Sequence, residues 1–227
     1  MNLFIDAWHY FTTAANWDGS AGIAHRLVQH VWYSFLAIAL SAVIAVPIGL
    51  LVGHTRRGGG AVVGFANAMR ALPTLGVLTF VVLGLGLGLL PPLLALITVG
   101  VPPLLAGAYA GIANVDPTVV DASRAMGMRE RQILLRVEVP NAMPVLLTGL
   151  RSTTLQVVAT ATIAAYVNLG GLGRYIFDGI ALYKYDRVLV GALLVALLAL
   201  VLDSLLAVVV WLSAPGKGRL RRARSAA

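Results

Sequence analysis

Residues 121–144 have the sequence DASRAMGMRERQILLRVEVPNAMP, the most charged internal stretch of a chain that is otherwise strongly apolar. Just before it, Asp116 is suited to cap a helix and Pro117 to occupy the first helical position. Residues 117–126 favour a helix. Gly127 favours its end, because glycine takes the left-handed backbone conformation without steric penalty.

A second helical piece is expected after this glycine. Ile133, Leu134 and Val137 fall on one face of it and the arginines elsewhere. Pro140 is expected to end this piece. The stretch therefore predicts a stiff unit of helix, glycine bend and helix. Two interpretations stay open on physical grounds: a lever that a soluble partner moves, or a basic loop that rests on lipid headgroups.

The composition places this unit in a membrane protein. Of 227 residues, 59% are hydrophobic and 11% charged, with a mean hydropathy of +0.87. A soluble domain of this length needs a far more polar surface. The chain has no cysteine, which excludes disulfides and cysteine-based metal sites. Its net charge of +8 is typical of basic cytoplasmic loops, and we expect no nucleic-acid binding.

An all-α integral membrane protein is therefore expected. A spanning helix needs about 20 mostly apolar residues, and about five segments qualify: residues 31–53, 61–84, 91–113, 144–167 and 188–212. The sequence RALPT, residues 70–74, predicts a break in the second segment, and Pro102 and Pro103 predict a kink in the third. Pro144 is expected to open the fourth. No internal repeat relates the segments, which argues against a transporter built from two fused halves.

The distribution of lysine and arginine predicts the orientation. One face holds eleven basic residues: Arg56, Arg57, Arg124, Arg129, Arg131, Arg136, Lys217, Arg219, Arg221, Arg222 and Arg224. The other holds Arg26, Arg174, Lys184 and Arg187. Because cytoplasmic loops carry the excess of positive charge, the first face is expected to be cytoplasmic. The N-terminus is then outside and the C-terminus inside.

Three regions follow. Residues 1–30 are expected to form an extracytoplasmic amphipathic lead-in at the membrane surface, without the pattern of a cleaved signal peptide. Residues 31–212 form the membrane domain, with a cytoplasmic loop at 114–143. Residues 213–227 form a basic cytoplasmic tail, whose charge is explained by orientation and by attraction to anionic lipid.

Several other side chains are candidates for a polar route or a gate through the membrane: Gln156, Thr160, Asn168, Gly170, Gly171, Gly173 and Asp203. The polar ones can equally form hydrogen bonds between helices, and the glycines can form a simple turn. Asp203 is an acid within a span, a costly position that marks functional candidates, and Arg151 or Arg70 can pair with it. No pair of the four histidines has the helical i, i+4 spacing, so no metal site is expected.

The opening stretch resembles the EAA loop of bacterial ABC-importer permeases. The matching residues are Asp121-Ala122-Ser123, then Gly127 after three further residues, then Val137-Glu138-Val139-Pro140 after nine more. Asp121 and Ser123 depart mildly from the Glu and Ala of that pattern. The resemblance covers about residues 17–212 and implies a type I ABC-importer permease fold. It is closest to permeases for osmoprotectants such as glycine betaine, choline and carnitine.

In that family the loop is a coupling helix that docks in a groove of an ATPase subunit. The resemblance assigns this role to Asp121, Ala122, Ser123, Arg124, Met126, Gly127, Met128, Val137, Val139 and Pro140. The glycines at 170–173 would belong to the gate. The sequence has no Gly-rich Lys-Ser/Thr phosphate-binding loop. The chain is thus expected to bind no cofactor and to be a transport subunit rather than an enzyme, with ATP and Mg²⁺ used by the partner.

The resemblance implies further partners: two ATPase subunits, a second permease chain, identical or related, and an extracytoplasmic solute-binding protein. It also implies a multi-pass location in the bacterial inner membrane. Import of another small solute, such as methionine, nitrate or a sulfonate, is the alternative within the class. A channel or secondary transporter that needs no ATPase, and a membrane scaffold, are the alternatives outside it.

Overall fold

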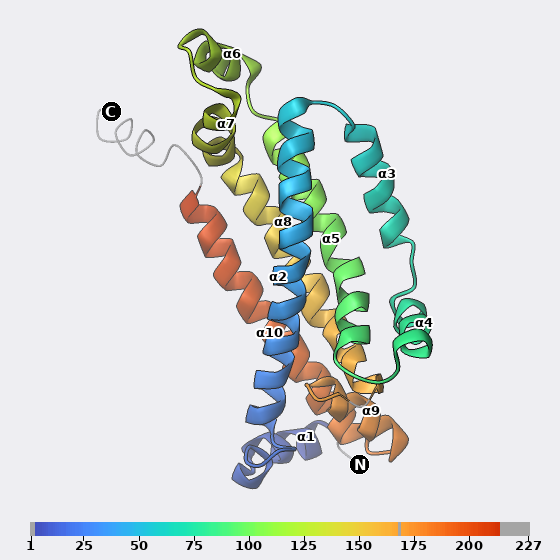
Figure 1. Cartoon of the computed structure of the whole chain (residues 1–227). Helices are drawn as coiled ribbons and strands as arrows, with labels where there is room; N and C mark the ends of the chain where they lie inside the picture. The colour runs from blue at the N-terminus through green and yellow to red at the C-terminus, as the bar shows by residue number, and fades with distance from the viewer. Residues whose placement is uncertain (1–2, 168, 214–227) are drawn as a thin grey trace, which may run out of the picture.

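The computed structural model describes residues 3–167 and 169–213, and it is helical throughout the described chain (Figure 1). A short α1 (Leu3–Thr12) and a 3₁₀ turn (Ala14–Asn16) precede the bundle. The remaining helices are α2 (Ile23–Thr55), α3 (Gly59–Arg70), α4 (Thr74–Leu85), α5 (Leu90–Ala113), α6 (Pro117–Ala125), α7 (Glu130–Ile133), α8 (Val139–Thr160), α9 (Gly173–Ala181) and α10 (Tyr185–Ser213). A π-helical segment (Leu134–Glu138) joins α7 to α8, and a 3₁₀ segment (Ala161–Val167) follows α8.

Four long helical segments and one bent pair are apolar enough to cross a membrane. The long segments are Ile23–Thr55, Leu90–Ala113, Glu130–Val167 and Tyr185–Ser213. The pair is α3 with α4, which carries the chain back between the ends of α2 and α5 (Figure 1). α1 and the last turn of α10 lie at opposite ends of the bundle. The five expected segments are thus all present as helix.

The first helix is longer than expected, because it begins at Ile23 rather than near residue 31. Its 33 residues give a length of about 50 Å at 1.5 Å per residue, whereas the hydrocarbon core of a bilayer is about 30 Å thick. α2 must therefore project beyond that core, and its last turn, which contains His54, is free to meet the charged loop.

The expected break in the second segment is confirmed. α3 ends at Arg70, α4 begins at Thr74, and the two helices meet at an angle of 82°. Pro73 explains the break, because proline lacks the N–H that would continue the helical bonds and restricts the residue before it to extended conformations.

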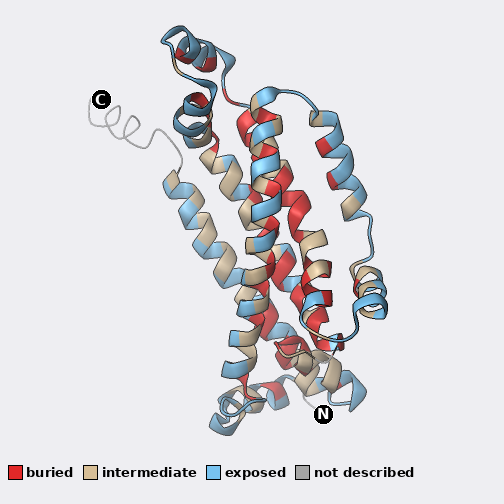
Figure 2. Ribbon diagram, viewed as in Figure 1, coloured by how far each residue is buried: buried red, intermediate tan, exposed pale blue. Residues whose placement is uncertain are grey.

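The core lies where α5 packs between α2 and α8 (Figure 2). Small residues let these backbones approach closely. A Cβ on Gly107 of α5 would lie 2.8 Å from the Gly149 Cα of α8, and one on Gly49 of α2 would lie 2.5 Å from the Ala108 Cβ. α10 is far less buried and runs along the edge of the bundle.

The prolines of the third and fourth segments lie within continuous helices. α5 continues through the buried pair Pro102 and Pro103, and the Thr153 hydroxyl of α8 donates to the neighbouring Gly100 carbonyl at 3.3 Å. The prediction that Pro140 ends one helix and Pro144 opens the next is wrong: both lie in α8. The π-helical segment accounts for this, since the Val139 N–H donates five residues back to Leu134 and widens the turn just before Pro140.

Candidate coupling loop and solute pathway

The first helix of the loop has the cap that the sequence predicts. The Asp116 carboxylate accepts hydrogen bonds from the Thr118 N–H at 2.9 Å and the Thr118 hydroxyl at 2.8 Å. These bonds favour the charged form and lower the pKa of Asp116. α6 ends at Ala125, and Gly127 follows with φ of +80°. The predicted helix and glycine bend are therefore both present.

The residues of the EAA-like motif divide into an outward and an inward set. Asp121, Ala122, Arg124, Met126, Gly127 and Pro140 are exposed. Met128, Val137 and Val139 are half-buried against the cluster of Ile112, Val115, Val120, Ile133 and Ala142. Ser123 is buried, and its hydroxyl donates to the Val119 carbonyl at 2.7 Å. The outward set forms a surface that a partner can contact, while the inward set holds the loop on the bundle.

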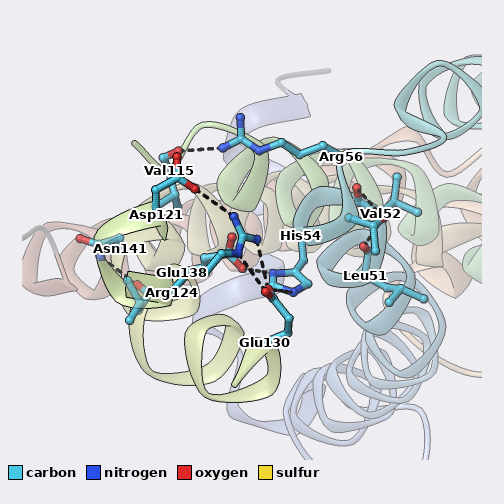
Figure 3. Close-up of polar contacts among 12 residues, drawn as sticks. Leu51, Val52, His54, Arg56, Val115, Asp121, Arg124, Glu130, Glu138 and Asn141 are labelled. Atoms are coloured by element: carbon cyan, nitrogen blue, oxygen red, sulfur yellow. Dashed lines mark hydrogen bonds and ion pairs between the residues drawn. The ribbon is translucent and has the colours of Figure 1, made fainter. Parts of the chain in front are cut away.

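Ion pairs join the two helices of the loop (Figure 3). Arg124 donates to both carboxylate oxygens of Glu130, at 2.8 and 3.1 Å, and to Asp121 at 3.1 Å. Hydrogen bonding to Glu130 raises the pKa of Arg124 above its ordinary value. The two-pronged contact fixes the angle of the bend at Gly127 more firmly than a single ion pair, because the guanidinium and carboxylate planes must align.

The same network reaches the last turn of α2 through His54. His54 Nδ1 lies 2.5 Å from Glu138 Oε2, and His54 Nε2 lies 3.2 Å from Glu130 Oε2. Only 3% of the Glu138 side chain is exposed, so its carboxylate depends on this partner to offset lost hydration. A second tie runs from Arg56 Nη2 to the Val115 carbonyl at 3.2 Å. The loop is thus joined to α2 at two points.

Sequence reasoning missed this network. The sequence pattern assigns no partner to His54, and Glu138 enters only as a residue within the EAA-like motif. The available signal was Glu138 itself, because an acid flanked by apolar residues on a packed helix needs a buried partner. The identity of that partner, 84 residues away in the chain, carries no local signal.

Two of the pathway candidates meet in one cleft. Gln156 and Thr160 of α8 line a cleft of about 280 Å³ together with Arg70 and Thr74 at the α3–α4 break and Thr98 of α5. Asp203 lies elsewhere: its carboxylate is paired with Arg151, with Nη2 2.6 Å from Oδ2. This pair joins α8 to α10, so the structure provides one of the two partners that the sequence left open.

The glycines at 170–173 are packed tightly against α2 and the end of α8. The Gly171 N–H donates to Gln29 Oε1 at 3.0 Å. A Cβ on Gly170 would collide with the Gln29 amide, and one on Gly173 would lie 2.2 Å from the Thr162 carbonyl oxygen. The three glycines therefore serve close approach between helices. Asn168 lies outside the described residues.

A helical bundle that is apolar enough to cross a membrane, with a charged helix–bend–helix loop at one end and a polar cleft among its helices, has the features expected of a permease. The chain belongs to the binding-protein-dependent transport system inner membrane component family, which its residues 45–210 match. It is therefore a multi-pass protein of the inner membrane, in a family of transport permeases rather than enzymes.

Curated relatives are osmoprotectant permeases. The chain is 35% identical over 186 residues to the glycine betaine/carnitine/choline transport system permease protein OpuCB of Bacillus subtilis (strain 168), covering 82% of this chain and 86% of that protein. It is 37% identical over 175 residues to the carnitine transport permease protein OpuCB of Listeria monocytogenes, covering 77% and 80%. It is 30% identical over 207 residues to the osmoprotectant import permease protein OsmW of Salmonella typhimurium (strain LT2), covering 89% and 94%.

Solved structures agree on the fold. An inward-facing MetNI methionine ABC transporter chain superposes with a TM-score of 0.74 at 21% identity, covering 85% of this chain and 96% of that one. A chain of an amino acid ABC transporter crystallised with histidines gives a TM-score of 0.64 at 19% identity, covering 81% and 90%. The type I ABC-importer permease fold expected from the sequence is confirmed.

Proposed function

We propose that this chain is the permease subunit of an ATP-driven importer for osmoprotectants such as glycine betaine, carnitine or choline. The substrates for which these relatives are named, at 30–37% identity over most of the chain, support the substrate class. Under this proposal, two permease chains enclose the pathway, two ATPase subunits dock on the loops, and a binding protein delivers solute from outside. ATP and Mg²⁺ act in the ATPase.

The observation that carries the coupling role is the continuous path of polar contacts from the exposed loop to a spanning helix. It runs from Arg124 through Glu130 to His54, and Glu138 holds His54 from the other side. Closure of the ATPases on ATP would move the exposed face of α6. Because the loop and α2 are tied, this displacement would tilt α2 and open the pathway outward, and hydrolysis would reset it. The chain supplies the conduit and the lever.

The direct test is uptake of labelled glycine betaine into vesicles that hold this chain and its ATPase, with binding protein and ATP present. ATP-dependent accumulation establishes both the class and the substrate group. ATP hydrolysis that responds to the permease, without accumulation of glycine betaine, carnitine or choline, keeps the coupling role and contradicts the substrate group. Labelled methionine, offered in parallel, tests the alternative solute. Uptake without ATP favours a channel or secondary transporter. If the vesicles take up no solute and the chain does not associate with the ATPase, a scaffold is favoured.

A further inference from the structure

The cleft at the α3–α4 break has polar side chains in its walls and lies among helices that are apolar enough to cross a membrane. Its volume of about 280 Å³ is close to the lower end of small-molecule sites, which span about 300–1,000 Å³. α3 and α4 both pack against α5 and bend by 82° at the break, and side chains from α3, α4, α5 and α8 line the cleft beside it. Discontinuous helices within the membrane are typical of solute sites in transporters.

Arg70 brings a positive charge to this cleft. It is the last residue of α3, within the bent helix pair that is apolar enough to cross a membrane. The other arginine within a candidate span, Arg151, is paired with Asp203. Among the residues that the structure describes, no carboxylate lies within ion-pair distance of Arg70, and no acid lines the cleft. A cation within a membrane-spanning segment is costly and marks a functional position.

The other polar groups complete a binding surface for an anion. Thr74 and Thr160 line the cleft, and within the described chain their hydroxyls make no hydrogen bond, so each can donate one to a ligand. The Gln156 amide donates one bond to the Ser152 hydroxyl at 3.0 Å and has a second N–H. Met69, Leu72 and Val99 supply apolar walls, and no aromatic ring lines the cleft. The cleft therefore has donors for a carboxylate and lacks the aromatic faces that attract a quaternary ammonium group.

We propose that this cleft is a solute subsite in which Arg70 binds the carboxylate of a zwitterionic solute, of the glycine betaine or carnitine class, and that it discriminates against choline. Choline carries the same trimethylammonium group but a neutral hydroxyl in place of a carboxylate. It therefore offers Arg70 at most one neutral hydrogen-bond acceptor and no negative charge to offset the repulsion between the two cations. This inference rests on the proposed function and narrows its substrate group. The apolar walls are left to contact the methyl groups.

The test compares uptake of labelled glycine betaine, carnitine and choline by the reconstituted complex of permease, ATPase and binding protein. We expect the first two to be imported about tenfold faster than choline, the ratio that one lost charge-assisted bond produces. In Arg70→Gln, uptake of glycine betaine falls by about tenfold and uptake of choline does not. Arg70→Lys, which keeps the charge and loses the two-pronged geometry, gives intermediate uptake.

Asn67→Ala is the matched control, because Asn67 is an exposed polar residue of the same helix that does not line the cleft; its uptake should equal that of the unmodified complex. Co-purification of the ATPase with each variant shows that the chain is folded. The subsite is overturned if the unmodified complex takes up choline and glycine betaine equally. It is also overturned if glycine betaine uptake by Arg70→Gln stays within about twofold of that by the unmodified complex.

A second measurement separates the subsite from the proposed function. Equilibrium binding of labelled glycine betaine to the detergent-solubilised permease–ATPase complex, without binding protein, does not require transport. If the unmodified complex imports none of the three solutes, the proposed substrate group is wrong, and binding then decides the subsite alone. The subsite is supported if carnitine displaces the bound glycine betaine, choline does not displace it, and Arg70→Gln abolishes the binding. The subsite is overturned if there is no binding, or if Arg70→Gln leaves the binding unaffected.

Discussion

His54 and Glu138 show how one contact can serve both stability and coupling. The imidazole is 11% exposed and the carboxylate 3% exposed, with 2.5 Å between Nδ1 and Oε2. Removing the partner of a buried carboxylate costs more free energy than the intact pair contributes to stability. The reason is that the unpaired carboxylate stays buried and does not regain its hydration. This contact is also the point where the loop meets α2. A change here should therefore affect coupling before it affects insertion.

We predict that Glu138→Ala and His54→Ala each lower the number of solute molecules imported per ATP hydrolysed, by about tenfold. Because both variants break the same contact, the double variant should be no worse than either single one. The measurement is the ratio of uptake to ATP hydrolysis in vesicles. Arg136→Gln, a change at an exposed residue of the π-helical segment, is the control that should leave the ratio unchanged. Additive losses in the double variant would show that the two residues act separately.

At the scale of elements, the loop is a bracket-shaped unit of two short helices, α6 and α7, joined by the bend at Gly127. The cap at Asp116, the bend at Gly127 and the Arg124–Glu130 pair set the geometry of its two arms. The π-helical segment then joins the bracket to α8 without a break, so one end of the lever is itself part of a spanning helix. The loop therefore continues directly into a spanning helix, which the sequence did not predict.

A Gly127→Trp variant should fold and insert but fail to accumulate solute with ATP. A Cβ at Gly127 meets no atom within 4 Å, so the indole projects outward, where it blocks a tight partner contact. Gly127→Ala is the matched control, since it shares the strain of a positive φ and lacks the bulk. Uptake and ATPase co-purification are measured for both. Normal uptake by the Trp variant would contradict coupling through this surface, and equal loss in both variants would assign the effect to backbone strain.

The crossing of α5 and α8 should tolerate no added side chain. A Cβ on Gly149 would lie 3.0 Å from the Gly107 Cα and from the Pro103 carbonyl oxygen, and backbone atoms cannot rotate aside. Gly149→Leu is expected to destabilise the bundle by about 1–3 kcal/mol and to lower the midpoint of thermal unfolding in detergent. Gly64→Leu is the control, because nothing lies within 4 Å of a Cβ at Gly64. Equal midpoints for the two variants would show that the crossing can adjust.

At the scale of the whole molecule, a central group of α2, α5 and α8 carries peripheral helices. α3 and α4 pack against α5, and α10 packs against α8. The polar cleft lies where α3 and α4 meet α5 and α8. The loop connects α5 to α8 in the chain, and the same two helices line the cleft. A tilt imposed at the loop can reach the cleft through the packed core, because close-packed helices move as bodies rather than deform.

The orientation of the molecule is a prediction from its basic residues, and the absence of cysteine from the sequence makes it directly testable. Ser20 and Gly60 are exposed residues at opposite ends of α2, beyond its first and last turns. In intact cells, a membrane-impermeant maleimide should label Ser20→Cys and not Gly60→Cys. In permeabilised cells, the same reagent should label both variants. The reverse pattern would overturn the assignment of the basic face to the cytoplasm.

The sequence by itself determined the helical membrane class, the positions of the spans, the break at Pro73, the cap at Asp116 and the bend at Gly127. Each of these follows from chemistry within a few residues: apolar length, a proline that lacks an N–H, a carboxylate that reaches the next turn, a glycine that lacks a Cβ. The same local reasoning was wrong at Pro140 and Pro144, which both lie in α8. At Pro140 it assumed α-helical spacing, whereas a π-helical turn directly precedes this proline.

Only the tertiary structure decided which groups meet. It paired Asp203 with Arg151 rather than Arg70, placed Glu138 against His54, and brought Gln156 and Thr160 to the same cleft as Arg70. The physical reason is that a charge in an apolar layer needs a partner of opposite charge or a hydrogen-bond partner. The sequence shows which residues need such a partner, but it does not show which residue the partner is. The partner is chosen by the helix packing, which the small residues at Gly49, Gly107 and Gly149 set at close range.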